Sequence, residues 1–343
     1  MNIVLDASYS VGRNLSGVGR HSREILFGLA KSQPQQRFQF AYRPHRLRGS
    51  FADALPRNVT RTLLYGPCPS ADIFHGLNQR LDAGRFRKSV VTFHDLFALT
   101  GEYATPEFRR RFAAQAREAA DRADLIIADS LFTAGQVTDL LGVEPVRLRV
   151  IPLGAIRPAI VPRPDALRRN VILHVGAIQS RKNIVRLVRA FAATPSDWEL
   201  ILAGSAGFGV EQALSAIAAS PRRSQIRVLG YVTDGRLAEL YDEARILAFP
   251  SLEEGFGMPV IEAMSHGLPV LTSNSSALRE VAGCAALLVD PTDENAIGAG
   301  LCALAVNEDA RRDLRERGFA HVEKYRWETA VERTWQVYGE LDH

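Results

Sequence analysis

The sequence has few cysteines and no long apolar run. Only three cysteines, Cys68, Cys284 and Cys302, occur among its 343 residues, and none forms a Cys-x-x-Cys pair. This spacing argues against a disulfide scaffold and against structural zinc. No apolar stretch approaches the roughly 18 residues that a membrane-spanning helix needs. The first residues, MNIVLDASYS, predict a strand and not a signal peptide, so we expect a cytoplasmic protein.

Lysine is also scarce, and the charge is uneven along the chain. Four lysines stand against 38 arginines; residues 1–160 hold 22 Lys and Arg against 14 Asp and Glu, and residues 161–343 hold 20 against 24. The basic clusters of the first half are Arg43, Arg46 and Arg48; Arg85, Arg87 and Lys88; and Arg109, Arg110 and Arg111. They lack interleaved aromatics, so we predict no nucleic-acid partner. They indicate either a solvated face or attraction to an anionic partner. That partner would be a membrane surface, at the inner face of the cell membrane, or a lipid-linked phosphate.

Short apolar runs alternate with longer amphipathic runs along the whole chain, which predicts an α/β protein with parallel sheets covered on both faces. The predicted strands are 3–5, 38–42, 73–75, 90–93, 125–128, 148–151, 171–175, 199–203, 227–229, 246–249, 269–272 and 286–289. The predicted helices are 17–31, 107–122, 131–141, 183–193, 235–243, 259–266, 294–306, 310–324 and 327–341.

A proline-rich segment divides this alternation into two halves. We predict a Rossmann-like domain over 1–153, a linker over 154–170, a second Rossmann-like domain over 171–326 and a terminal helix over 327–343. Doubly wound sheets bind ligands at the carboxyl ends of their strands, so sheets that face each other would share one cleft.

The most informative stretch is PSLEEGFGMPVIEAM, residues 250–264. A predicted buried strand leads into a loop with Gly255 and Gly257 and then into a helix, a geometry that directs backbone N–H groups at an anion. Glu254 precedes the loop and Glu262 lies in the early turns of the helix, where its side chain leans back toward the same end. Together they suit a phosphate-bearing polyol; the plainer interpretation is that the glutamates only stabilise the helix start.

Three other motifs follow predicted strands. Gly17 and Gly19 form a GxG turn, which lacks the third glycine of a dinucleotide fingerprint and would equally suit tight packing. His94 stands at the end of the run 89–93, where a lone histidine is often structural and where Asp95 could fix its tautomer or cap a turn. Arg181 and Lys182 lie between a strand and a helix, and a lysine kept beside an arginine in this arginine-rich chain indicates a compact point charge.

The string E-G-F-G-x-P-x-x-E resembles the E-x7-E signature of retaining glycosyltransferases of the large family 4-like group that includes many bacterial mannosyltransferases. That resemblance implies the GT-B architecture, with an acceptor-side first domain, a donor-side second domain and a last helix that packs back on the first. It implies catalytic roles for Glu254, His94, Arg181 and Lys182. The implied donor-binding residues are Glu262, Gly17, Gly19, Gly255, Phe256, Gly257, Met258, Pro259, Tyr231 and Val232.

The implied reaction moves a hexose, with GDP-mannose favoured, from a nucleotide-diphosphate sugar to a hydroxyl of a glycan or lipid-linked glycan in polysaccharide biosynthesis. Fixed cations and amides would neutralise the departing diphosphate. We therefore expect no cofactor and no metal, and no Asp-x-Asp pair follows any predicted strand. Gln179 and Ser180 replace residues usual in the family, which leaves the donor open.

Other classes remain open at this point. A sugar-nucleotide epimerase or hydrolase, or a non-catalytic scaffold that binds sugar nucleotides, could use the same fold and phosphate site. A nicotinamide-dependent dehydrogenase would need the fingerprint that this chain lacks.

Overall fold

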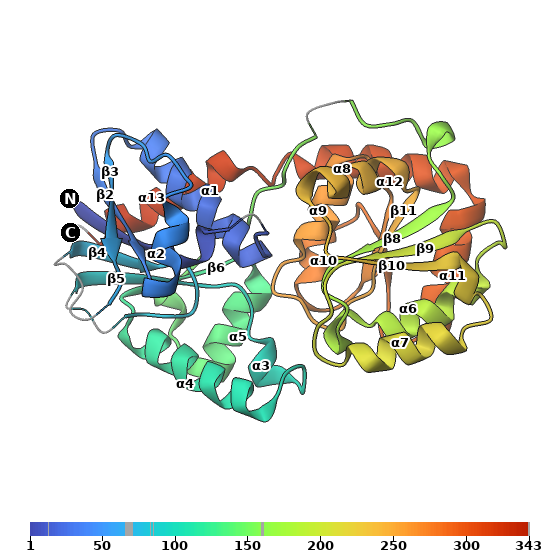
Figure 1. Cartoon of the computed structure of the whole chain (residues 1–343), viewed down its shortest axis with the longest axis horizontal. Helices are drawn as coiled ribbons and strands as arrows, with labels where there is room; N and C mark the ends of the chain where they lie inside the picture. Colours follow the sequence, from blue (N-terminus) through green and yellow to red (C-terminus); the bar gives the residue numbers. More distant parts are fainter. Residues whose placement is uncertain (13, 66–70, 83, 85, 159–160, 342–343) are drawn as a thin grey trace. The chain divides into compact units, whose positions relative to one another are not determined.

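The computed structural model describes residues 1–343 except 13, 66–70, 83, 85, 159–160 and 342–343, so Cys68 and Arg85 lie outside the described residues. The chain forms two compact units (Figure 1). The first contains 1–100, 106–154 and 325–343, and the second contains 101–105 and 155–324. No helix in the described part of the chain is both long and apolar enough to cross a membrane.

The first unit is built on a seven-stranded parallel sheet with the order β3-β2-β1-β4-β5-β6-β7. Its strands are β1 (Asn2–Asp6), β2 (Arg37–Tyr42), β3 (Val59–Leu63), β4 (Ala71–Gly76), β5 (Phe86–Phe93), β6 (Leu125–Ala128) and β7 (Leu148–Val150). Strand β6 is apolar and fully buried, and β1 is buried from Ile3 to Asp6, as expected where helices cover both faces of a parallel sheet.

Helices cover both faces of this sheet. They are α1 (Gly17–Ser32), α2 (Pro44–Ser50), α3 (Phe97–Thr100), α4 (Pro106–Arg122), α5 (Leu131–Leu141) and α13 (Trp327–Glu340). A buried core beneath α3, α4 and α5 includes Phe93, Phe112 and Ile126. The last helix, α13, packs against α1 within the same unit.

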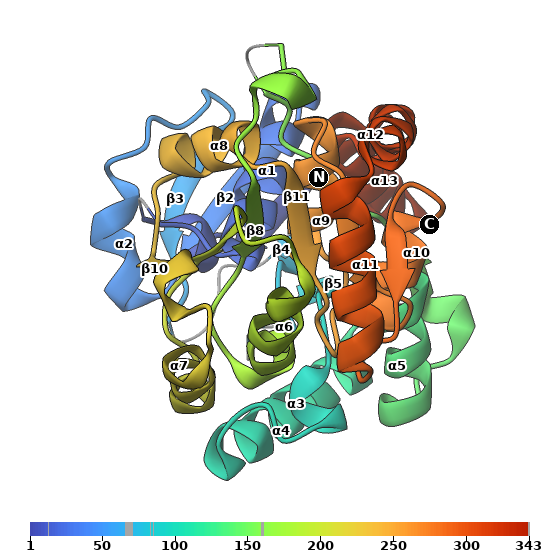
Figure 2. The same ribbon diagram turned by 90° about the vertical axis from the view of Figure 1, so that its right-hand side faces the viewer.

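The second unit is built on a six-stranded parallel sheet with the order β10-β9-β8-β11-β12-β13. Its strands are β8 (Val171–Val175), β9 (Glu199–Ala203), β10 (Ile226–Gly230), β11 (Ile246–Phe249), β12 (Val270–Ser273) and β13 (Leu287–Val289). In the view of Figure 1, α6 and α7 lie below the sheet and α8, α9 and α12 above it. Figure 2 shows the same ribbon from its right-hand side. Its helices are α6 (Ile184–Ala190), α7 (Val210–Ala219), α8 (Asp234–Glu243), α9 (Met258–Ser265), α10 (Ser276–Ala282), α11 (Glu294–Val306) and α12 (Glu308–Val322).

The predicted α/β class with two doubly wound parallel sheets is confirmed. Strands 125–128, 171–175, 199–203 and 246–249 have the predicted bounds, and α9 begins at Met258, one residue before its prediction. The sequence analysis missed β3 and four helices, namely α2, α3, α7 and α10. All of these except α7 have seven residues or fewer, and elements this short depend on tertiary packing more than on local propensity.

A buried hydrogen bond ties α13 to the first sheet. The Tyr338 hydroxyl lies 2.6 Å from Nδ1 of His75 on β4, and His75 Nε2 lies 2.8 Å from Oγ1 of Thr92 on β5. Burial lowers the pKa of His75 to about 3, so this ring is neutral at physiological pH.

We expect Tyr338→Phe to lower the free energy of unfolding by about 1–3 kcal/mol, because a buried ring nitrogen loses its partner. Tyr65→Phe, at a side chain that is 75% exposed, is the matched control and should change it by less than about 0.5 kcal/mol. Chemical denaturation measures both, and equal effects of the two substitutions would contradict the anchoring role of Tyr338.

Candidate functional site

Three predicted site residues of the second unit, Arg181, Lys182 and Glu254, gather where its strand order reverses. From β8 the chain winds outward to β9 and β10, and it then returns to β11 on the other side of β8. Arg181 and Lys182 follow β8, and Glu254 follows β11. Loops after such neighbouring strands run in opposite directions and leave a crevice at the carboxyl ends, the usual ligand site of this sheet type.

Glu254 forms a buried ion-pair cluster with both cations. Its Oε2 lies 2.9 Å from Nη1 of Arg181, and its Oε1 lies 2.5 Å from Nζ of Lys182. All three residues are less than 10% exposed. Burial would raise the pKa of Glu254, but the charges of Arg181 and Lys182 outweigh it and lower this pKa to about 2. One carboxylate and two cations leave the cluster with one net positive charge, which favours an anionic ligand.

Lys182 also contacts the aromatic ring of Phe249 on β11. Its Nζ lies 4.8 Å from the ring centroid of Phe249, a cation–π distance. The His174 ring stacks on Phe249, and burial lowers the pKa of His174 to about 4, with Lys182 adding to that effect. This neutral histidine therefore adds no second positive charge to the cluster.

Asn183 completes the loop after β8. It has a left-handed backbone with φ of 61°, a conformation that asparagine tolerates better than most residues. Its Nδ2 donates to the carbonyls of Pro250 at 3.0 Å and Pro291 at 2.7 Å. This side chain joins the loops that follow three different strands. Sequence reasoning missed this function, although the position of Asn183 directly after Arg181 and Lys182 could have signalled it.

The glycine loop between β11 and α9 is largely buried. Gly257 is the N-cap of α9 with φ of 106°, and a Cβ there would lie 2.5 Å from Leu278 Cδ2, so only glycine fits. Gly255 and Phe256 are buried, while Met258 and Pro259 at the start of α9 are half-buried. The loop thus presents the N-terminus of an eight-residue helix at the sheet edge.

Glu262 is buried on α9 and is held by a tyrosine. The Tyr241 hydroxyl on α8 donates to Glu262 Oε2 at 3.0 Å, and the Tyr241 ring stacks on His266. Tyr241 was not predicted as a site residue, because no local motif marks it. Each carboxylate oxygen has two lone pairs, so a carboxylate fixed in this way can accept further hydrogen bonds.

Helix α10, which the sequence analysis missed, positions Glu254. Ser276 Oγ accepts the Glu254 N–H at 3.3 Å, and the Ala277 N–H donates to the Glu254 carbonyl at 3.2 Å. Ser276 has φ of 53°, a strained conformation for a serine, as is common where a site over-determines the backbone. Tyr231 and Val232, which the resemblance predicts to bind the donor, follow β10, and Tyr231 is 43% exposed.

The predicted residues of the first unit follow β1 and β5. Gly17 is the first residue of α1, and the Gly19 N–H donates to Oγ of the N-cap Ser16 at 3.2 Å. A Cβ on Gly19 would lie 2.8 Å from the Tyr9 carbonyl, so close packing alone explains this glycine. His94 directly follows β5, and its Nδ1 lies 2.6 Å from Oδ2 of Asp129, which follows β6.

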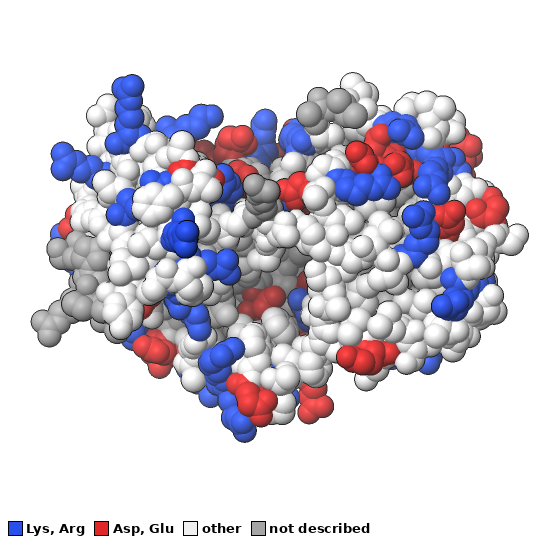
Figure 3. Space-filling view, in the orientation of Figure 1, with Lys and Arg blue, Asp and Glu red and all other residues white. Residues whose placement is uncertain are grey.

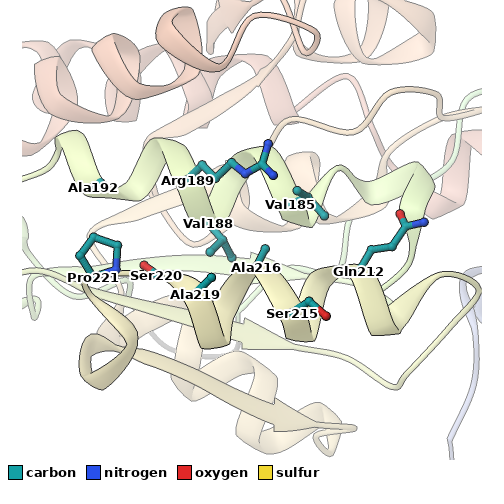
Figure 4. A pocket seen from close by; sticks show the side chains of 10 residues that line it. All are labelled: Val185, Val188, Arg189, Ala192, Gln212, Ser215, Ala216, Ala219, Ser220 and Pro221. Carbon is teal, nitrogen blue, oxygen red and sulfur yellow. The ribbon is translucent and has the colours of Figure 1, made fainter.

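Two hollows of the second unit are not lined by Arg181, Lys182 or Glu254. A groove of about 550 Å³ between α6 and α7 is lined by small apolar and polar side chains with Arg189 (Figure 4). A second hollow of about 290 Å³ includes Gln179 and Ser180 from the loop that carries Arg181.

Within the described residues, no group of three or more His, Cys, Asp or Glu could hold a metal ion.

The basic residues of the first unit are partly paired. Arg43 lies 3.5 Å from Asp6, Lys88 lies 3.1 Å from Asp124, and Arg110 pairs with Glu107. On the face drawn in Figure 3, the first unit shows mainly Lys and Arg, and the second shows both signs.

Comparisons with known proteins identify the family. The model described as Glycosyltransferase Family 4 matches residues 16–155, and the model described as Glycosyl transferases group 1 matches residues 160–321. O-antigen chain mannosyltransferase B of Escherichia coli is 33% identical over 282 residues, which cover 78% of this chain and 74% of that protein.

Solved structures agree on the fold. Sucrose-phosphate synthase of Thermosynechococcus elongatus aligns over 99% of both chains with a TM-score of 0.77 at 21% identity. HepE of Anabaena, in complex with UDP and glucose, aligns over 98% of this chain and 99% of its own with a TM-score of 0.74 at 16% identity. The chain therefore belongs to the glycosyltransferase family that these two models describe, and it has the GT-B fold of its structural neighbours.

Proposed function

We propose that this glycosyltransferase moves a hexose, with mannose from GDP-mannose favoured, to a hydroxyl of a glycan or lipid-linked glycan in polysaccharide biosynthesis. The observation that carries the proposal is the Arg181–Lys182–Glu254 cluster at the strand-order reversal of the second sheet. Its net positive charge suits a diphosphate. The similarity to O-antigen chain mannosyltransferase B supports the choice of mannose, and the UDP in HepE supports a nucleotide donor.

Charge balance assigns roles to the cluster. Breaking a sugar–phosphate bond develops negative charge on the diphosphate and positive character on the sugar. Arg181, Lys182 and the N-terminus of α9 would neutralise the diphosphate, so the proposed reaction requires no metal. Glu254, with the amides of Gly255 and Phe256, would hold sugar hydroxyls.

The remaining groups would hold the nucleoside and the sugar. Glu262 would accept from the ribose diol, Tyr231 and Val232 would contact the base, and Gly17 and Gly19 would approach the diphosphate. His94 would contact the donor sugar. The acceptor hydroxyl would attack on the leaving-group face and pass its proton to the departing phosphate, with retention at the anomeric carbon. An inverted anomer in the product, read by NMR, would contradict that course.

The acceptor proposal includes contact with an anionic membrane surface through the basic residues of the first unit. Salt-sensitive binding to vesicles that contain anionic lipid would support this contact, and equal binding to neutral vesicles would contradict it.

Substitution of Glu254 should lower turnover, whereas substitution of Glu262 should weaken donor binding. We expect Glu254→Ala to lower kcat about 100-fold, because it removes hydrogen bonds to the reacting sugar and frees two buried cations. We expect Glu262→Ala to weaken donor binding about tenfold, because it loses a charged hydrogen bond to the ribose. Steady-state kinetics and calorimetry separate the two effects. Glu316→Ala, at an exposed position of α12, is the control, and unchanged donor affinity in Glu262→Ala would contradict the ribose role.

Thermal stabilisation by different nucleotides should identify the donor nucleotide. A ligand that binds only the folded protein raises Tm according to its affinity and concentration. Among GDP, UDP, dTDP and ADP with their sugars, we expect GDP and GDP-mannose to give the largest rise, and the same rise in EDTA. A larger rise with another nucleotide would overturn the GDP assignment, and a rise abolished by EDTA would overturn metal independence.

A further inference from the structure

Three histidines and one aspartate cluster in the first unit, where His94 is partly exposed and the other three residues are buried. His94 follows β5, His75 lies on β4, His21 lies on α1, and Asp129 follows β6. The His21 and His94 rings meet edge-to-face with centroids 4.6 Å apart. His75 is occupied by Tyr338 and Thr92, so its two ring nitrogens are accounted for.

Both ring nitrogens of His94 face acceptors. Nδ1 lies 2.6 Å from the Asp129 carboxylate, and Nε2 lies 3.1 Å from the carbonyl oxygen of Leu77. A carbonyl can only accept, so Nε2 must carry a proton, and a carboxylate at 2.6 Å requires a proton on Nδ1 as well. The geometry is that of an imidazolium, which has no lone pair left to act as a base.

The burial of the Asp129 carboxylate also requires a positive charge on His94. Asp129 is 1% exposed, and its Oδ1 is buried without a hydrogen-bond partner among the described residues. A carboxylate buried in this way is costly unless a cation lies beside it. His94 is the partner that the structure provides.

We propose that Asp129 is a positioning residue that holds the His94 ring through Nδ1 and keeps it doubly protonated. This inference rests on the proposed function only where it concerns catalysis: a fixed cation, and not a base, would then face the donor sugar. With both of its N–H groups donating to Asp129 and Leu77, His94 would act as a fixed positive charge, in keeping with a retaining course that needs no protein base.

The surroundings of His94 contain groups that raise its pKa and groups that lower it. Burial lowers the pKa of His94, whereas the charge and hydrogen bond of Asp129, the Leu77 carbonyl and the charge of Asp95 raise it, and the net shift is upward. Burial lowers the pKa of His21 and His75, and the charge of His94 contributes, so both rings stay neutral. A raised folded-state pKa means that the stabilisation from protonated His94 is present below pH 6.5 and lost as pH rises through the folded-state value.

The test is a titration of the histidine rings by ¹⁵N NMR on the full-length, ligand-free protein, with His94 signals assigned by their loss in His94→Gln. In the wild type, both His94 nitrogens should carry protons at pH 7. In Asp129→Asn, which keeps the size of the side chain and removes its charge, the ring should lose a proton below pH 6.5, the ordinary histidine value. Asp129→Glu should restore a higher value, and Asp139→Asn, at an exposed aspartate of α5, should leave it unchanged.

A wild-type His94 with one unprotonated nitrogen at pH 7 would overturn the proposal, and this result does not depend on any Asp129 variant. The same holds for an Asp129→Asn titration equal to that of the wild type. With GDP-mannose as donor, kcat of Asp129→Asn should fall by about tenfold at pH 8 relative to wild type and approach it at pH 5.5. A fall independent of pH would indicate a merely structural role. Absence of transfer by the wild type would contradict the proposed function. The NMR titration would still test whether Asp129 keeps His94 doubly protonated.

Discussion

The buried contact between Glu254 and the cations Arg181 and Lys182 is the interaction on which the second unit's site depends. Three charged residues with less than 10% exposure are tolerated only because they neutralise one another. This requirement fixes the loop after β8 against the loop after β11. It also leaves one positive charge in excess at the edge where parallel sheets bind their ligands.

Much of the remaining structure of the second unit serves to hold that contact. Asn183 joins the loops by two hydrogen bonds to carbonyls, and α10 holds the backbone of Glu254 through Ser276 and Ala277. Gly257 turns the chain into α9 without a side chain that would strike Leu278. The site is therefore preorganised by polar contacts to the backbone and not by apolar packing alone.

The fold and the charged part of the site were predictable from the sequence, because they depend on local pattern. Buried parallel strands are continuous apolar runs, and Arg181, Lys182 and Glu254 lie in the loops that follow two such runs. Tyr241, Ser276 and Asp129 were not predictable, since each acts on a residue that the sheet topology, and no local motif, brings beside it. Asp129 follows β6 and His94 follows β5, and only the pairing of those strands places their ends together.

The central claim is that Lys182 belongs to a diphosphate site, and calorimetry with a nucleoside diphosphate and its monophosphate tests it most directly. For GDP and GMP, the wild type should bind the diphosphate more tightly, and Lys182→Gln should reduce that preference about tenfold or more, because a charged hydrogen bond to the second phosphate is lost. Lys324→Gln, the same change at an exposed lysine of the second unit, should keep the wild-type preference. An unchanged preference in Lys182→Gln would contradict the account.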